Sequence, residues 1–296
     1  STFHSACVRI LRQEATRLGY SNSFSIYDSA DSQRLITIVA KELNLDAKRY
    51  PARQFQSMIS NAKNELLGPQ DYLNAASNPF EQIVADVYAV YQQRLIRANA
   101  MDFDDLILKT VEVLQRYPEA KARFRSRFRH VLVDEYQDTN HAQYILVKEL
   151  VGTELEGQAP AELCVVGDAD QSIYGFRGAT IRNILQFELD YPNARTVLLE
   201  QNYRSTQNIL NAANAVITKN ESRKEKNLWS DAGAGSPLTG YVAESEHDEA
   251  NFIADEIRSL QREGVSTPGD TAIFYRTNAQ SRVFEEVFMR NALPYK

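Results

Sequence analysis

The sequence predicts an α/β fold with a mainly parallel sheet, preceded by an all-helical segment. Residues 3–127 place apolar side chains at helical spacing, in one stretch after another. From residue 130 onward, short apolar runs alternate with helical stretches, which is typical of buried parallel strands joined by helices. Ligands of such sheets bind beyond the carboxyl ends of the strands, so residues at those ends are the first candidates for a functional site.

The all-helical segment divides at residues that commonly begin helices. Asp31 or Ser29 is expected to cap the second helix, and Asp102 the last one. Pro51 and Pro79 stand where two other helices are expected to begin. The apolar positions of these helices fall within residues 6–18, 35–43, 55–66, 83–95 and 106–114.

The α/β part contains apolar runs that are expected to be strands. Several of them end in acidic residues, which places carboxylates where parallel sheets bind ligands. The expected strands are residues 130–135, 163–168, 196–200 and 272–275. The expected helices are residues 140–151, 178–189, 204–219 and 246–262.

Composition excludes several classes of protein. The chain has 296 residues, 43% of them hydrophobic, and a net charge of −6, so it is neither disordered nor a uniformly basic nucleic-acid coat. A local basic groove stays open, because residues 1–130 carry a charge of +4 and residues 131–296 a charge of −10. Cys7 and Cys164 form neither a disulfide framework nor a zinc motif, which favours a reducing compartment. The sequence shows no signal peptide and no apolar run of membrane-spanning length.

Two carboxylates, Asp134 and Glu135, end the first apolar run. A strand that ends in this way can hold Mg²⁺ with one acid and orient a water molecule with the other, as nucleotide hydrolases do. The alternative is a solvated pair of acids at a strand end. The pattern by itself is compatible with both.

Residues 167–178 form a glycine-flanked loop after the second run. Gln171 is suited to contact a phosphate or an attacking water through its amide. Tyr174 and Phe176 alternate with polar residues, and exposed rings there would stack on nucleic-acid bases, at about 1–3 kcal/mol each. The alternative is that both rings pack in the core.

Residues 200–205 stand at an expected turn from strand to helix. Arg204 could approach a phosphate held by a neighbouring domain, and such an arginine finger contributes roughly 10³–10⁵ in rate. Tyr203 could cover the face of a purine. The alternative is a helix capped by Ser205, with Arg204 as a surface charge. His4, a lone histidine near the N-terminus, is by itself more often structural than functional.

These segments, in this order, resemble the UvrD/PcrA/Rep family of superfamily 1 DNA helicases, and the PcrA/UvrD branch in particular. Six short sequences carry the resemblance, which spans nearly the whole chain. They are TFHS at 2–5, DFDDL at 102–106, VDEYQDTN at 133–140, VVGDADQSIYGFRGA at 165–179, LEQNYRS at 199–205 and YRTNAQSR at 275–282.

The resemblance implies roles in the chemistry of ATP. Asp134 would help to hold Mg²⁺, and Glu135 would activate the attacking water. Gln171 would sense the γ-phosphate and couple it to DNA contacts. Arg204 would act as an arginine finger from a second RecA-like domain, and Tyr203 would stack on adenine. The implied cofactors are therefore ATP and Mg²⁺.

The resemblance also implies contacts with DNA. Tyr174 and Phe176 would stack on single-stranded bases, although many relatives have Trp where this chain has Phe176. Phe3 and His4 would lie along the DNA strand. Arg177 would pair with acidic groups near the nucleotide and couple the two sites. Two further candidates, for DNA contact or domain packing, are Asn278 and Arg282.

The implied architecture is RecA-like parallel-sheet domains of the P-loop NTPase type with an all-helical insertion. Residues 1–128 would form the insertion, residues 129–200 the later part of the first RecA-like domain, and residues 201–296 the first half of the second. The sequence G-x-x-x-x-G-K-[ST] does not occur in the chain, so the phosphate-binding loop is not in it. We therefore expect an internal portion of a larger helicase that is ATPase-inactive by itself.

The expected function of the larger protein is ATP-driven 3′→5′ movement on single-stranded DNA with duplex unwinding, in DNA repair and replication. The expected partners are single-stranded DNA, junctions of single and double strands, and repair proteins, without a membrane. The expected location is the bacterial cytoplasm, at the nucleoid. An alternative is a module that only binds single-stranded DNA or another protein. A fused helicase–nuclease ranks below both, because the chain shows no constellation of carboxylates and lysine typical of a nuclease.

Overall fold

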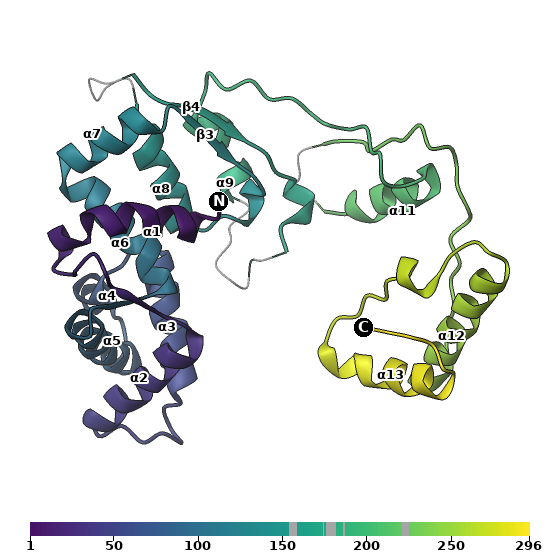
Figure 1. Ribbon diagram of the computed structural model, residues 1–296, viewed down its shortest axis with the longest axis horizontal. Helices are drawn as coiled ribbons and strands as arrows, with labels where there is room; N and C mark the ends of the chain where they lie inside the picture. The colour runs from purple at the N-terminus through teal and green to yellow at the C-terminus, as the bar shows by residue number, and fades with distance from the viewer. Residues whose placement is uncertain (154–158, 174, 176–181, 186, 221–224) are drawn as a thin grey trace. The chain divides into compact units, whose positions relative to one another are not determined.

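The protein is seen here in a computed structural model that describes residues 1–153, 159–173, 175, 182–185, 187–220 and 225–296. The chain forms two compact units. The first comprises residues 1–198 and 220–226, and the second comprises residues 199–219 and 227–296. In Figure 1 most of the first unit is coloured purple to teal, and the second green to yellow.

Helices make up most of residues 1–128. They are α1 (Phe3–Glu14), α2 (Ser29–Glu42), α3 (Ala52–Asn64), α4 (Pro69–Ala75), α5 (Pro79–Arg97), α6 (Phe103–Arg116) and α7 (Pro118–Arg127). Two short strands, β1 (Ser25–Tyr27) and β2 (Ala100–Asp102), pair in parallel among them. The segment is therefore mainly helical, and the two strands correct the expectation that it is all-helical.

Local side-chain contacts explain where these helices begin. Asp102 caps α6 as predicted, because its carboxylate accepts the backbone N–H of Asp105 at 2.8 Å. At α2 the structure corrects the expectation, since the cap is Asp28, which accepts the N–H of Asp31 at 2.8 Å. Asp31 accepts the N–H of Asp28 in return, and the two acids form a capping box. Ser29 is already the first helical residue, so it cannot be the cap.

Two apolar cores stabilise the helical segment. One lies where α1 packs on α6 and includes Leu11 and Leu114, and the other lies among α2, α3 and α5 and includes Phe55 and Tyr88. Each large apolar side chain that leaves water in this way contributes about 1.5–3 kcal/mol. The helices are amphipathic, and among the described residues no helix is long and apolar enough to cross a membrane.

A buried cluster of charges lies between α3 and the start of α6. Lys63 is fully buried, and its Nζ lies 2.7 Å from Asp102 and 2.9 Å from Asp105. Burial by itself lowers the pKa of Lys63, but the two carboxylates outweigh it and raise that pKa well above its usual range. Tyr91 donates its hydroxyl to Asp102 at 2.9 Å, and Gln92 donates to Asp105 at 3.2 Å. The paired charges therefore join α3 to the start of α6, and the hydrogen bonds of Tyr91 and Gln92 join α5 to both.

The first two strands predicted after residue 130 form a second parallel pair. β3 (His130–Val133) lies beside β4 (Glu162–Val165), in a register that sets Val133 next to Val165. Both strands are confirmed and are shorter than expected. Helix α8 (His141–Val151) connects them, and the short helices α9 (Arg182–Leu185) and α10 (Phe187–Asp190) follow. Parallel pairing puts the carboxyl ends of β3 and β4 at the same edge.

The second unit contains helices α11 (Gln207–Ile217), α12 (Glu246–Arg262) and α13 (Ser281–Arg290). The predicted helix over 246–262 is confirmed, whereas the strands expected at 196–200 and 272–275 are not formed. Most of their apolar side chains are exposed, with Leu199 at 78% and Phe274 at 93%, whereas Ile273 packs on the core of the second unit. An apolar run becomes a strand when a neighbouring strand accepts and donates its backbone hydrogen bonds along its length. At the end of the first run the carbonyl of Glu200 accepts the N–H of Trp229 at 3.1 Å, but among the described residues neither run forms a ladder of such bonds.

Candidate active site

The carboxyl ends of β3 and β4 bring two predicted site segments together. Beyond the last paired residues, Val166 donates its N–H to the carbonyl of Val133 at 2.8 Å, and Tyr136 donates its N–H to the carbonyl of Val166 at 2.9 Å. Asp134 and Glu135 therefore leave β3 next to the loop that leaves β4. This is the edge at which parallel sheets bind ligands.

The backbone of Glu135 adopts an unusual conformation at this edge. Its φ is 50° and its ψ is 44°, which is the left-handed region that residues with a side chain rarely occupy. Such a residue costs roughly 1–2 kcal/mol. The N–H of Glu135 donates to Oδ1 of Asp134 at 2.9 Å, and both side chains are exposed. Strained residues of this kind cluster at functional sites, where the strain orients a side chain.

The two acids fit the needs of a magnesium ion that is shared with phosphates. Mg²⁺ usually keeps several water molecules and is held by one or two carboxylates together with substrate oxygens. Asp134 and Glu135 supply two carboxylates at an exposed edge. The donor set therefore fits Mg²⁺ that also binds substrate oxygens.

Asp168 organises the loop after β4. Its carboxylate accepts the N–H of Asp170 at 2.9 Å and the Nε2 of Gln171 at 2.7 Å. Lys226 forms an ion pair with Asp168 and lies 3.3 Å from Asp170. Burial opposes ionisation of Asp168, but the hydrogen bonds from Lys226 and Gln171 outweigh it and lower the pKa of Asp168. The amide of Gln171 is therefore oriented by a carboxylate that stays charged.

Gln137 connects the two segments, and the sequence analysis did not single it out. Its amide donates to Oε2 of Glu135 at 2.7 Å and accepts the N–H of Asp168 at 2.9 Å. Its sequence signals are its position two residues after Glu135 and its place within VDEYQDTN at 133–140. Hydrogen bonds thus run from Glu135 through Gln137 and Asp168 to Gln171.

The residues expected to lie along DNA at the N-terminus stand at the start of α1. Thr2 caps the helix by accepting the N–H of Ser5 at 3.2 Å. Phe3 is half-buried against the apolar cores, so part of its ring is accessible. The ring of His4 contacts Phe103 edge to face, with 5.5 Å between the centroids, and burial lowers the pKa of His4. Phe103 is 52% exposed, and the sequence analysis passed over it.

Tyr203 and Arg204 lie in the second unit, on a turn before α11. Asn202 shapes the turn, because its side-chain oxygen accepts the N–H groups of Arg204 at 2.9 Å and of Ser205 at 2.8 Å. Tyr203 is 85% exposed and donates its hydroxyl to Gln201 at 2.9 Å. Both predicted side chains thus project from a locally fixed backbone.

The remaining predicted site residues divide into two groups. Asn278 and Arg282 are exposed, at a 3₁₀ turn and at the start of α13. Tyr174, Phe176 and Arg177 lie outside the described residues. The roles expected for all five stay predictions.

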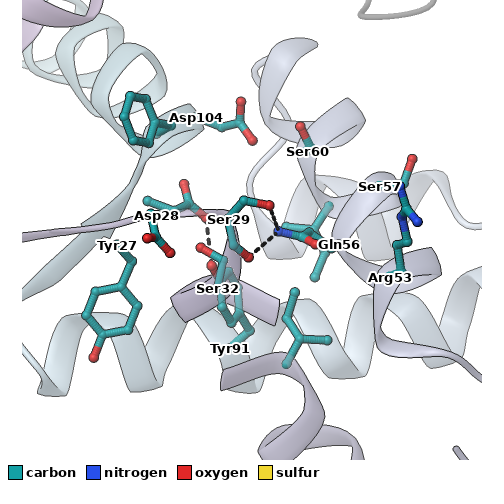
Figure 2. A pocket seen from close by; sticks show the side chains of 14 residues that line it. Tyr27, Asp28, Ser29, Ser32, Arg53, Gln56, Ser57, Ser60, Tyr91 and Asp104 are labelled. Carbon is teal, nitrogen blue, oxygen red and sulfur yellow. Dashed lines mark hydrogen bonds between the residues drawn. The ribbon is translucent and has the colours of Figure 1, made fainter. Parts of the chain in front are cut away.

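The first unit also contains a pocket that the sequence analysis did not anticipate. It has a volume of about 450 Å³ and lies among α2, α3 and the start of α6 (Figure 2). Gln56, on its wall, donates to the carbonyl oxygen of Ser29 at 3.0 Å and to the Ser29 hydroxyl at 3.2 Å. Burial, and then the charge of Asp102, raise the pKa of Asp104 on the same wall to about 6. No residue predicted for ATP or DNA lines this pocket.

Comparison with known proteins gives the family. The family model of the UvrD/REP helicase N-terminal domain matches residues 1–192, and that of the UvrD-like helicase C-terminal domain matches residues 197–296. The chain belongs to the UvrD/REP helicase family. Membership in the UvrD/REP family confirms the expected resemblance and places the chain among the helicase domains of the P-loop NTPase superfamily.

Curated UvrD/REP relatives align with the whole chain. The ATP-dependent DNA helicase UvrD1 of Mycobacterium tuberculosis is 60% identical over 301 residues, which cover 100% of this chain and 39% of that protein. The ATP-dependent DNA helicase PcrA of Bacillus subtilis is 49% identical over 295 residues, again 100% of this chain and 39% of the relative. The chain thus spans about 39% of the length of these relatives.

Proposed function

We propose that this chain is part of an ATP-dependent DNA helicase that moves 3′→5′ along single-stranded DNA and unwinds duplexes, in DNA repair and replication. The observation that carries the proposal is the edge where β3 and β4 end. There Asp134 and Glu135 are joined to Asp168 and Gln171 by hydrogen bonds. The names of the relatives, ATP-dependent DNA helicases, support it.

The proposed chemistry assigns a task to each residue near the nucleotide. Asp134 helps to hold Mg²⁺, which when bound offsets the charge of the β- and γ-phosphates. Glu135 accepts a proton from the attacking water, and Gln171 contacts the γ-phosphate through its amide. In the second unit, Tyr203 stacks on adenine and Arg204 neutralises charge on the transferred phosphoryl group. A carboxylate beside an oriented amide suits phosphoryl transfer to water, which uses side chains that accept a proton from the attacking water or orient it.

The proposed DNA path uses aromatic side chains. Phe3 and His4 lie along the strand, and Tyr174 and Phe176 stack on bases, while Arg177 links them to the nucleotide. Stacking tolerates any base, which suits a protein that moves along DNA. Asn278 and Arg282 are proposed to contact DNA or to pack between domains. The proposed partners also include junctions of single and double strands and repair proteins, at the nucleoid in the cytoplasm.

The proposed domain organisation is the one that the resemblance to the helicase family implies. Residues 1–128 are assigned to the insertion of the first RecA-like domain, residues 129–200 to the later part of that domain, and residues 201–296 to the first half of the second.

Unwinding by the intact protein tests the proposal. With ATP and Mg²⁺, it should separate a duplex that carries a 3′ single-stranded tail and leave a duplex with a 5′ tail intact. Failure on both substrates, or preference for the 5′ tail, would contradict the proposal. The chain of 296 residues by itself is expected not to hydrolyse ATP. If it nevertheless binds labelled single strands with an affinity that falls with salt, the binding-module alternative holds for the isolated chain.

A further inference from the structure

The side-chain amide of Gln137 has one possible orientation, because both of its ends are used. Its Nε2 donates to Oε2 of Glu135 at 2.7 Å, and its Oε1 accepts the backbone N–H of Asp168 at 2.9 Å. An ionised carboxylate only accepts hydrogen bonds, and a backbone N–H only donates them. The flipped amide would therefore satisfy neither partner. With 1% of Gln137 exposed, water does not replace either bond.

The backbone around Gln137 is packed too closely for another arrangement. A Cβ on Gly167 would lie 2.5 Å from Oε1 of Gln137 and 3.1 Å from the backbone N of Tyr136. The loop after β4 reaches the amide this closely because residue 167 has no side chain. Ser172 adds a hydrogen bond from its hydroxyl to the carbonyl oxygen of Gln137 at 3.3 Å.

The two ends of the amide meet groups with different tasks. One end holds the carboxylate of Glu135, whose backbone is in the strained left-handed conformation. The other end holds the N–H of Asp168, the residue whose carboxylate orients Gln171. A shift of Gln171 therefore displaces Asp168, and with it the amide that orients Glu135.

We propose that Gln137 is a positioning residue: it orients the Glu135 carboxylate for attack by water and transmits the position of the Asp168–Gln171 loop to it. This inference rests on the proposed function, because it takes Glu135 as the group that activates water. The link ends on the Glu135 carboxylate itself, so its loss should change the rate of hydrolysis more than the affinity for ATP.

Steady-state ATP hydrolysis by the intact protein, with and without single-stranded DNA, tests the inference. Gln137→Met keeps the volume of the side chain and removes both hydrogen bonds. We expect kcat to fall by up to about 100-fold, as misplacement of a reacting group by about 1 Å can do. The affinity for a non-hydrolysable ATP analogue should stay the same, and stimulation by DNA should weaken because the link to Gln171 is cut.

Gly167→Ala provides a second variant that leaves Gln137 in place. Its new Cβ collides with Oε1 of Gln137, so it should reproduce the loss of kcat with ATP affinity intact. Gln92→Met is the matched control, because Gln92 is a buried amide that donates to the carboxylate of Asp105 and takes no part in the hydrogen bonds that run from Glu135 to Gln171. It should lower stability and leave kcat unchanged.

The outcomes separate the two claims. Wild-type protein without DNA-stimulated hydrolysis would contradict the proposed function, and this inference with it. Wild-type hydrolysis together with unchanged kcat in Gln137→Met and Gly167→Ala would overturn the inference alone. A loss of kcat in Gln92→Met as large as in Gln137→Met would also overturn it, since the effect would then follow stability rather than position.

Discussion

The helical segment (residues 3–127) and the strand-end segment (residues 130–172) differ in the burial of their key charged side chains. In the helical segment, Lys63 and Asp105 are fully buried and paired, and they join helices to one another. In the strand-end segment, Asp134 and Glu135 are exposed, and Glu135 has a strained backbone. Buried, paired charge fixes a structure, whereas exposed, oriented charge is available for chemistry. We therefore expect stability and function to depend on different parts of the first unit.

The buried lysine should give the largest effect on stability. Lys63→Met leaves Asp102 and Asp105 without their cation, and breaking such a buried pair costs about 3–5 kcal/mol. Urea denaturation followed by circular dichroism measures the free energy of unfolding. Lys41→Met, at an exposed position of α2, is the control and should fall within about 0.5 kcal/mol of wild type. Equal losses of free energy of unfolding in Lys63→Met and Lys41→Met would contradict the view that the buried charges stabilise the helical segment.

Within the strand-end segment, two neighbouring residues of β3 should differ in how much their substitution by Ala lowers the free energy of unfolding. Val133 is 6% exposed and Leu132 is 76% exposed. Val133→Ala removes buried apolar surface and should lower the free energy of unfolding by about 1–3 kcal/mol. Leu132→Ala, measured in the same way, should cost a small fraction of that. A larger loss for Leu132→Ala would show that the exposed face of this strand is covered.

Asp104 should make stability depend on pH. Its pKa rises from 3.8 to about 6 in the folded protein because burial and the charge of Asp102 disfavour ionisation. The folded state therefore prefers the protonated acid, and the stability associated with it is present below about pH 4 and is lost as pH rises through about 6. Asp104→Asn should remove this loss and be more stable than wild type at pH 8 by about 1–2 kcal/mol.

The control for this prediction is the same pair of proteins at pH 4, where the greater free energy of unfolding of Asp104→Asn should vanish. Urea denaturation at both values of pH makes the comparison. An advantage that does not change with pH would mean that packing, rather than ionisation, distinguishes the two proteins.

The smallest of these effects concerns the helix cap that the sequence analysis misplaced. Asp28→Ala removes the carboxylate that accepts the N–H of Asp31 and should cost about 1 kcal/mol. Asp86→Ala, at an exposed position within α5, changes the same residue type without a cap and should be near neutral. If the two substitutions lower the midpoint temperature of thermal unfolding equally, the capping box does not stabilise α2.

The helical segment was largely predictable because helices satisfy their hydrogen bonds locally. Apolar spacing and starting residues located α5 at Pro79 and α6 after Asp102. The pairing of Lys63 with Asp102 was not predictable, since it depends on contacts between distant parts of the chain. The strands expected at 196–200 and 272–275 are not formed for the same reason, because a strand needs a neighbouring strand and apolar composition does not supply one.

The candidate site was predictable in its residue types and not in its connections. Position at the end of an apolar run singled out Asp134 and Glu135, and the structure places both at the edge shared with the Asp168–Gln171 loop. The positive φ of Glu135 and the bridging amide of Gln137 follow from how two loops meet, which spacing along the chain does not encode.

Hydrolysis of ATP by a Glu135→Gln variant of the intact protein tests the central claim most directly. The substitution keeps the shape of the side chain and removes the group that would accept a proton from water. We expect DNA-stimulated hydrolysis to fall by roughly 10²–10⁴-fold, while ATP binding and the unfolding curve stay as in wild type. Hydrolysis at the wild-type rate would contradict the assignment of Glu135, and with it the reading of this strand end as the catalytic edge.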